Sequence, residues 1–331
     1  MPTEIKHVVV ADRLISRFAS ELENGLDGST WTHVDRHDVE RLRSELGRAD
    51  VFVGSALSAD LASAAPNLRL VHAAGAGVDG IAADALPRDV LLANVHEHGT
   101  SIAEYVMMAM LTLRRDLRRI DADLRTGVWT NPAVDSSAPL PSTIAGGLVG
   151  LVGYGHIGQA VAQAARALGM RVRAIRRRPE LSHDDPLLEH IGGPEELHDL
   201  AAAADALVIV IPLDDSSRGA IDADVIARMR PEAMLINVAR GPVVDEHALH
   251  AALTQRRIAG AALDVWWGAQ GLERTPSAPA TLDFGALDNV LMTPHISGVT
   301  VDTFRRRARR INENLHRLRA DEPLENLIER R

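Results

Sequence analysis

The sequence predicts an α/β protein with two doubly wound parallel sheets. Short apolar runs alternate with longer amphipathic stretches along nearly the whole chain, which is the pattern of parallel strands covered on both faces by helices. The chain has 331 residues, of which 46% are hydrophobic and 24% charged, so it is long enough for two domains with separate cores. A stretch rich in Pro and Ser at 130–146 has no periodicity and is the best candidate for a seam.

The first hundred residues predict a smaller sheet. Four short apolar runs, each closed by Gly, Asp, Asn or Ser, lie at 8–11, 51–54, 68–73 and 90–93. The segment that follows contains Ser101-Ile102-Ala103-Glu104, the pattern of a capping box in which the hydroxyl accepts from a backbone N–H and the glutamate reaches back. We therefore expect a long apolar helix over 102–113.

The second part of the chain predicts a larger sheet and a closing helix. Its strands are expected at 147–153, 171–176, 206–212, 233–239, 259–265 and 290–295. The Arg-rich segment 301–320 has the spacing of an amphipathic helix, and we expect its arginines on a solvated face rather than on a nucleic-acid surface.

Composition excludes several classes of protein. The chain has 36 Lys and Arg against 45 Asp and Glu, a formal charge of -9, so no basic field favours nucleic acid. No apolar run approaches the roughly 18 residues that cross a bilayer, and the N-terminus lacks the plan of a signal peptide; we expect a cytoplasmic protein with no membrane partner. Without cysteine, the chemistry must come from His, Arg, carboxylates, hydroxyls or a bound cofactor.

A glycine-rich segment predicts a dinucleotide site. The buried run at 147–153 leads into Gly153-Tyr154-Gly155-His156-Ile157-Gly158 and then a helix expected over 159–168. In this context the first glycine permits a tight turn, the second lets a pyrophosphate approach the backbone, and the third lets helix and strand pack closely. The helix N-terminus adds N–H groups and the positive end of its dipole.

The next strand predicts the choice of cofactor. An NAD site places a carboxylate about 20 residues after the glycines, at the end of the second strand, to hold the ribose 2′-hydroxyl. Here Ile175 is followed by Arg176, Arg177 and Arg178, and guanidinium groups suit a 2′-phosphate. NADP(H) is therefore favoured over NAD(H). The alternative is an exposed basic turn with mixed cofactor preference.

Two strand-end residues can act on a carbonyl. Ligands of open parallel sheets bind outside the carboxyl ends of the strands, where Gly153, Pro212, Arg240, Asp264 and His295 stand. Arg240 offers a planar fork that matches a carboxylate, and His295 is a natural proton donor or acceptor near neutral pH. Each alone has a plainer interpretation, as a salt-bridge arginine or a surface histidine. Their joint placement favours catalysis.

With these motifs the sequence resembles the D-isomer-specific 2-hydroxyacid dehydrogenase family over nearly its whole length. The resemblance rests on 150–158, on 235–246 around Arg240, and on Thr293-Pro294-His295-Ile296-Ser297-Gly298. It implies that Arg240 orients and polarises the substrate and that His295 transfers the proton. With the glycine motif and the arginines, the expected cofactor-binding residues are Gly153, Gly155, His156, Ile157, Gly158, Arg176, Arg177, Pro212, Val238, Ala239, Asp264 and Gly298.

The same resemblance implies how the domains are arranged. A flavodoxin-like substrate domain would comprise 1–100 plus 297–331, with a Rossmann cofactor domain, 101–296, inserted into it. Ala74-Gly75-Ala76-Gly77-Val78-Asp79 is similar to the family's substrate-carboxylate loop, which makes Gly75, Ala76 and Gly77 the expected substrate-binding residues. The family also implies a homodimer built through 101–144. The apolar residues 105–110 agree with a dimer, and a helix core explains them equally well.

The chain departs from the family beside the catalytic histidine. The family places a glutamate five positions after Asp264, and Ala269 stands there. Gln270 is one position late; the formate dehydrogenases of the same superfamily carry Gln and share the sequence Asp-Val-Trp found here at 264–266. Gln270, Glu273 in a bulged loop, or neither of them therefore orients His295.

Substrate identity is less constrained. By the same resemblance, His98 falls near positions that line the family's pocket; a surface loop is the alternative. A metal site at His96-Glu97-His98 is not expected, because adjacent side chains alternate in direction.

The leading interpretation of the reaction is reduction of a small 2-oxo acid, such as glyoxylate or hydroxypyruvate, to the D-2-hydroxy acid. The alternatives are oxidation of a formate-, phosphite- or phosphonate-like anion, and a corepressor-like dinucleotide sensor, which would need neither Arg240 nor His295.

Overall fold

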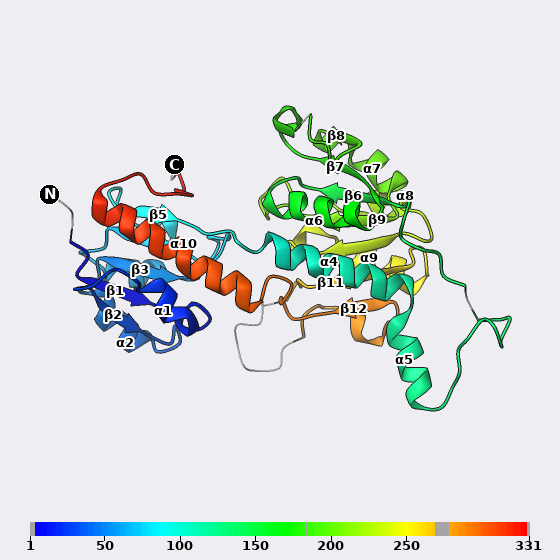
Figure 1. The fold of residues 1–331 in the computed structure, drawn as a ribbon, viewed down its shortest axis with the longest axis horizontal. Coiled ribbons are helices and arrows are strands. Elements are labelled where there is room, and N and C mark those ends of the chain that lie inside the picture. The colour runs from blue at the N-terminus through cyan, green and yellow to red at the C-terminus, as the bar shows by residue number, and fades with distance from the viewer. Residues whose placement is uncertain (1–3, 139, 183, 269–277, 330–331) are drawn as a thin grey trace. The chain divides into compact units, whose positions relative to one another are not determined.

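The chain forms two compact units, each around its own parallel sheet (Figure 1). The computed structural model describes residues 4–138, 140–182, 184–268 and 278–329. Unit 1 comprises Met1–Glu97 and Thr300–Arg331, and unit 2 comprises His98–Val299. The predicted α/β class with two doubly wound parallel sheets is confirmed.

Unit 1 holds a five-stranded sheet of order β2-β1-β3-β4-β5, the flavodoxin-like order. Its strands are β1 (His7–Val10), β2 (Thr30–His33), β3 (Val51–Gly54), β4 (Leu70–Ala73) and β5 (Leu91–Ala93). The sequence did not predict β2. It is an edge strand, Thr-Trp-Thr-His, whose residues are half-buried or exposed, so it carries no apolar run.

Helices from both ends of the chain cover the sheet of unit 1. They are α1 (Ala19–Leu22), α2 (Val39–Leu46), α3 (Ala59–Ser63) and α10 (Val301–Ala320). The bounds of α10 are those expected from the sequence. Its apolar face follows helical spacing through Phe304, Ala308, Ile311, Leu315 and Leu318, and it shares one core with strands β1 and β3. In Figure 1 this orange-red helix lies along the blue strands of the N-terminal segment.

Unit 2 holds a seven-stranded sheet of order β12-β11-β10-β9-β6-β7-β8. Renumbered within the unit, this is the Rossmann order 3-2-1-4-5-6 with one further strand. The strands are β6 (Leu148–Val152), β7 (Arg171–Ile175), β8 (His190–Gly192), β9 (Ala206–Ile209), β10 (Met234–Asn237), β11 (Gly260–Leu263) and β12 (Val290–Met292). The sequence did not predict β8, a three-residue edge strand.

The helices of unit 2 are α4 (Gly99–Arg114), α5 (Leu117–Arg125), α6 (His156–Ala167), α7 (Leu197–Ala203), α8 (Ala223–Arg228) and α9 (Glu246–Thr254). The capping-box interpretation of Ser101 is wrong, because α4 begins at Gly99 and Ser101 is buried in its first turn. Tertiary packing accompanies this start: a Cβ on Gly99 would lie 3.1 Å from the carbonyl oxygen of His156, so the glycine favours the close approach of α4 to α6.

Residues 130–146 carry neither helix nor strand where the structure describes them, as predicted, but they lie within unit 2, so the expected seam at this stretch is wrong. A stretch without periodicity marks a connection, and this connection joins two elements of one unit. Of the helices in the described ranges, none is long and apolar enough to span a bilayer.

Candidate active site

The glycine-rich turn after β6 has the shape that a diphosphate requires. Gly153 has φ +107°, and a Cβ there would lie 2.8 Å from Cγ2 of Ile211. A Cβ on Gly158 would lie 2.6 Å from the carbonyl oxygen of Gly153, which is the close approach of helix to strand. Around Gly155 no described atom lies within 4 Å of the Cβ position, so the backbone is open to a ligand on that side.

Helix α6 begins directly at this turn. The expected start at residue 159 is too late, since the first helical residue is His156 and the N-cap is Gly155. Because glycine has no side chain to cap the helix, the first-turn N–H groups face whatever occupies the open side of the turn. His156 is exposed and Ile157 is half-buried. These residues fit the diphosphate of a dinucleotide.

The arginines after β7 lie at the same end of the sheet. Arg176 is half-buried and donates from Nη1 to Oγ of Ser182 at 2.6 Å. Nη1 of Arg177 lies 3.5 Å from Oδ2 of Asp214, in the segment after β9 that also holds Pro212. The guanidinium groups are thus held beside the strands next to the glycine-rich turn, with Arg177 already facing a carboxylate.

The structure adds Tyr154, which sequence reasoning missed. Its hydroxyl donates to Oδ2 of Asp185 at 2.7 Å, and this bond ties the glycine-rich turn to the segment after β7. Burial, together with the Asp185 carboxylate, raises the pKa of Tyr154. A tyrosine inside the glycine motif was the only signal in the sequence, and it does not reveal its partner.

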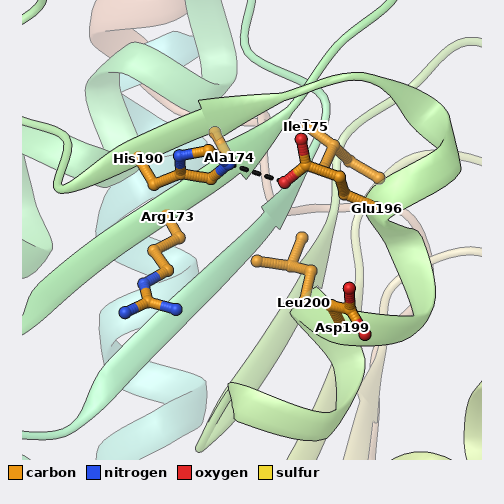
Figure 2. Close-up of a pocket in the computed structure, with 7 residues that line it drawn as sticks. All are labelled: Arg173, Ala174, Ile175, His190, Glu196, Asp199 and Leu200. Atoms are coloured by element: carbon orange, nitrogen blue, oxygen red, sulfur yellow. Dashed lines mark hydrogen bonds and ion pairs between the residues drawn. The ribbon is translucent and has the colours of Figure 1, made fainter.

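Unit 2 also has a pocket that is too small for a dinucleotide (Figure 2). It is lined by β7, β8 and α7, and Nε2 of His190 lies 2.6 Å from Oε2 of Glu196 beside it. Its volume of about 50 Å³ holds on the order of one or two water molecules, far less than a nucleotide.

The turn after β10 presents Arg240. Its shape depends on Asn237, a buried residue whose side chain donates to the carbonyl of Arg240 at 3.0 Å and accepts from the N–H of Ala239 at 3.0 Å. Val238 and Ala239 are buried, whereas Arg240 is half-exposed. Arg240 donates from Nη1 to the carbonyl of Ala239 at 2.8 Å. Asn237 is a second residue that sequence reasoning missed.

Asp264, after β11, organises the loop that carries His295. Its side chain is fully buried. Oδ1 accepts from Oγ1 of Thr293 at 2.6 Å and from the N–H of Ile296 at 2.8 Å, and Oδ2 accepts from the N–H of Ser297 at 2.8 Å. All three donors belong to the segment 293–297, so this one carboxylate fixes the loop from both sides of the histidine.

His295 itself is held in a strained backbone conformation. Its φ is +58°, in the left-handed region that non-glycine residues seldom adopt. Tyr105 of α4 extends the support: its hydroxyl lies 2.6 Å from Oγ1 of Thr293, and burial raises its pKa to about 12. Because the Thr293 hydroxyl donates to Asp264, Tyr105 is the donor in this bond.

His98 meets the same loop within unit 2. His98 is 8% exposed, and a Cβ on Gly298 would lie 3.3 Å from its Cβ. The sequence alternative of a surface loop therefore does not describe His98, which is buried against the loop that bears His295.

In unit 1 the predicted carboxylate loop follows β4. The carbonyl of Gly75 accepts from the N–H of Val95 at 3.3 Å, and that of Ala76 accepts from the side chain of Asn94 at 2.8 Å. In a trans peptide the carbonyl and the next N–H point in opposite directions. The N–H groups of Ala76 and Gly77 therefore point away from Asn94 and Val95.

Comparison with known proteins decides the family. The model for "D-isomer specific 2-hydroxyacid dehydrogenase, NAD binding domain" matches residues 107–297, more than half of the chain. The chain belongs to the D-isomer specific 2-hydroxyacid dehydrogenase family.

Relatives of this dehydrogenase support the same assignment. An (S)-sulfolactate dehydrogenase from Chromohalobacter salexigens is 34% identical over 71% of this chain and 72% of its own. A 2-ketogluconate reductase from Gluconobacter oxydans is 32% identical over 93% and 94%. The structure of an NADPH-dependent glyoxylate/hydroxypyruvate reductase from Sinorhizobium meliloti, in complex with NADP and malonate, has a TM-score of 0.78 at 26% identity, covering 98% of this chain and 99% of that one. The protein is an NAD(P)-dependent oxidoreductase that interconverts 2-oxo and 2-hydroxy acids.

In this 2-hydroxyacid dehydrogenase the candidate residues of unit 2 meet at one sheet edge. Arg240, Asp264 and His295 follow β10, β11 and β12, which are adjacent strands. Ala269, Gln270 and Glu273 lie outside the described residues. Within the described part of the chain, no group of three or more His, Asp or Glu side chains is placed to hold a metal ion.

Proposed function

We propose that this enzyme reduces a small 2-oxo acid to the D-2-hydroxy acid with NADPH. The observation that carries the proposal is that Arg240 and His295 flank Asp264 at the ends of three adjacent strands. The nicotinamide, when bound, supplies the hydride. Arg240 holds the substrate carboxylate with its planar fork and polarises the carbonyl, and His295 delivers the proton to the substrate oxygen.

The remaining residues bind and orient the two reactants. The N–H groups of Gly75, Ala76 and Gly77 bind the substrate carboxylate, and His98 borders the substrate. The cofactor lies on the residues predicted for it: Gly153, Gly155, His156, Ile157, Gly158, Pro212, Val238, Ala239, Asp264 and Gly298, with Arg176 and Arg177 at the 2′-phosphate. The NADPH-dependent reductase of similar fold supports this choice of cofactor.

The first experiment measures NADPH oxidation with glyoxylate and hydroxypyruvate, and the reverse direction with NADP⁺ or NAD⁺. We expect Arg240→Lys to lose about 2–4 kcal/mol in kcat/KM, because an ammonium cannot reproduce a two-pronged contact. Arg228→Lys, at an exposed arginine of α8, is the matched control and keeps full activity. Activity of Arg240→Lys within threefold of wild type contradicts the role of Arg240, and turnover of formate or phosphite alone, or NADPH binding without any turnover, contradicts the reaction.

A second experiment tests the cofactor. Arg176→Asp should weaken NADPH and improve the relative use of NADH, because a carboxylate repels the 2′-phosphate and accepts from the 2′-hydroxyl. The measurement is the ratio of kcat/KM for the two cofactors. An unchanged ratio would show that Arg176 does not contact the phosphate.

We also propose a homodimer built through 101–144. Of residues 105–110, all but Met108 are buried in the core of unit 2, so helix packing explains most of that apolar stretch. Between 101 and 144, however, several large apolar side chains are exposed: Met108, Leu111, Leu117, Leu124, Val128, Trp129, Val134 and Leu140. Such a concentration suits a second copy of the chain. Light scattering should give twice the chain mass for the wild type, and a monomer would refute the proposal.

A further inference from the structure

Arg307 of α10 is held flat against the carboxylate loop of unit 1. A Cβ on Gly75 would lie 3.5 Å from its Nη1 and 3.8 Å from its Cζ. On its other side, Cζ lies 5.1 Å from the centroid of the Phe304 ring, and Nε donates to the carbonyl of His96 at 3.3 Å. These contacts from both faces fix the orientation of the guanidinium at Gly75.

The position lies at the ligand-binding edge of this sheet. Asp12, Ser55, Gly75 and Asn94 follow the carboxyl ends of β1, β3, β4 and β5, and parallel sheets bind their ligands at that edge. The Asp12 carboxylate accepts from the N–H groups of Leu14 and Ile15 and from the Ser55 hydroxyl. The Asp12 carboxylate therefore accepts hydrogen bonds from its own loop and from the loop after β3.

The guanidinium of Arg307 is a desolvated cation. Burial lowers its pKa to about 10, against the opposing charges of Asp12 and Glu97, so it stays protonated at neutral pH. Charge pairs strengthen where water is excluded, and a guanidinium binds carboxylate, sulfonate or phosphate groups through two parallel N–H bonds. Arg307 has five N–H donors, and the bond to the carbonyl of His96 is made by Nε.

Two kinds of anion contact thus meet at one loop. The N–H groups of Ala76 and Gly77 are directed away from Asn94 and Val95, and Arg307 stands against the preceding residue, Gly75. A substrate whose carboxylate sits on the loop amides places its tail beside the loop. A tail that carries a second negative charge gains a partner there, and a neutral tail does not.

We propose that Arg307 binds a second anionic group of the substrate, so that the enzyme prefers 2-oxo acids with an additional carboxylate or sulfonate over those with a neutral tail. The inference rests on the proposed function and narrows its substrate class. Arg307 is a specificity residue in this view, and its loss raises KM for one class of substrate.

The experiment compares NADPH oxidation with oxaloacetate and with sulfopyruvate against 2-oxobutanoate and glyoxylate. For the wild type we expect kcat/KM at least tenfold higher with one of the two dianions, and the better of them identifies the tail group. Arg307→Met should lower that value on the order of a hundredfold, while 2-oxobutanoate stays within threefold. Arg307→Lys keeps the charge and should fall between them. Arg309→Met, at an exposed arginine of the same helix, is the control and keeps the preference.

The outcomes separate the two proposals. If the wild type reduces 2-oxobutanoate or glyoxylate at least as well as the dianions, the second-anion site is refuted and the proposed function stands. The site is likewise refuted if Arg307→Met loses both classes equally with unchanged thermal unfolding, or if Arg309→Met mimics it. Should Arg307→Met fail to fold, an undiminished dianion preference in Arg307→Lys together with full activity of Arg307→Gln on dianions refutes the site. If no 2-oxo acid is reduced, both proposals are overturned.

Discussion

At the scale of single residues, Asp264 shows how a side chain away from the surface controls one that is exposed. Its three hydrogen bonds end on Thr293, Ile296 and Ser297, and His295 lies among them at a positive φ. A left-handed residue persists only where its surroundings over-determine it. Asp264 supplies that determination through these three bonds.

We expect Asp264→Asn to lower the free energy of unfolding by about 2–3 kcal/mol, because an amide brings its own N–H groups against converging donors. It should also reduce kcat/KM at least tenfold, since His295 can leave its left-handed conformation. Tyr105→Phe is the milder comparison. It leaves the three bonds of Asp264 intact and should cost about 1 kcal/mol of stability, with activity within twofold. Chemical unfolding and steady-state kinetics measure both; equal behaviour of the two variants would contradict the role of Asp264.

At the scale of elements, glycines of unit 2 serve opposite purposes. A Cβ on Gly241 would overlap the carbonyl of Trp266, so the loops after β10 and β11 touch through their backbones. Around Gly155 the same construction meets nothing in the described protein within 4 Å. Gly241 lets two loops pack closely against each other, and Gly155 leaves room beside α6.

These two positions make a matched pair of variants. Gly241→Ala should lower the free energy of unfolding by about 1–3 kcal/mol, because the backbone of Trp266 cannot move aside as a flexible side chain can. Gly155→Ala should leave the unfolding temperature of the ligand-free protein unchanged and weaken NADPH at least tenfold, measured by fluorescence titration. NADPH binding that is undiminished in Gly155→Ala would show that the open side of the turn is not where the diphosphate lies.

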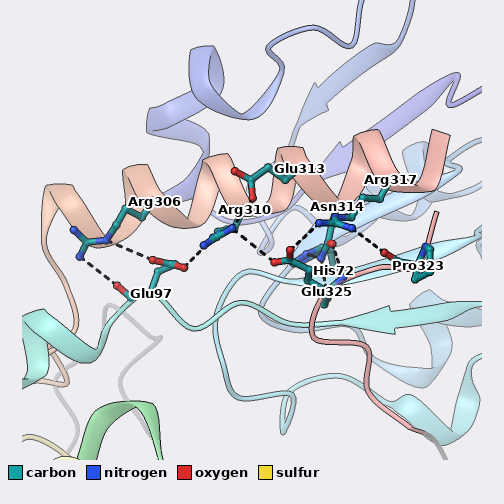
Figure 3. Close-up of polar contacts among 9 residues, drawn as sticks. All are labelled: His72, Glu97, Arg306, Arg310, Glu313, Asn314, Arg317, Pro323 and Glu325. Atoms are coloured by element: carbon teal, nitrogen blue, oxygen red, sulfur yellow. Dashed lines mark hydrogen bonds and ion pairs between the residues drawn. The ribbon is translucent and has the colours of Figure 1, made fainter. Parts of the chain in front are cut away.

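At the scale of the whole molecule, buried His72 joins the sheet of unit 1 to both C-terminal elements (Figure 3). Its Nε2 lies 3.0 Å from the side-chain nitrogen of Asn314 on α10, and Nδ1 lies 3.0 Å from the carbonyl of Ala73. Asn314 bonds both backbone groups of Glu325. Since the amide nitrogen donates, Nε2 accepts and Nδ1 carries the proton. This network requires a neutral imidazole.

Burial lowers the pKa of His72 from 6.5 to about 4, and stability therefore depends on pH. The folded protein binds the proton less readily than the unfolded chain, so this contribution is complete above pH 6.5 and is lost as pH falls toward 4. The loss should total about 3 kcal/mol. Urea unfolding of the wild type and of His72→Gln, measured between pH 7 and 4, gives their free energies of unfolding. The difference between the two free energies should shrink by that amount as pH falls. Parallel curves for the two proteins would mean that His72 titrates normally.

Figure 3 also shows why the charge of α10 could not be interpreted from spacing alone. The arginines were expected on a solvated face. Arg306 and Arg310 are half-exposed, and both reach Glu97 at the end of the N-terminal segment, at 3.6 Å and 3.2 Å. Arg307, between them, is turned inward against Gly75. Gly75 and His96, which it contacts, lie more than two hundred positions away in the chain, and no local pattern records them.

The sequence by itself determined the class of the fold, the glycine-rich turn, the bounds of α10, and the placement of Arg240, Asp264 and His295 at strand ends. Each of these depends on residues close together in the chain, either through the periodicity of apolar residues or through the residue types that end a strand. Edge strand β2 was not predicted because its residues are half-buried or exposed, and β8 was not predicted because it has only three residues. Only the tertiary structure decided the start of α4, and it alone paired Tyr105 with Thr293. Those outcomes depend on contacts between distant segments, whose energies a local pattern does not contain.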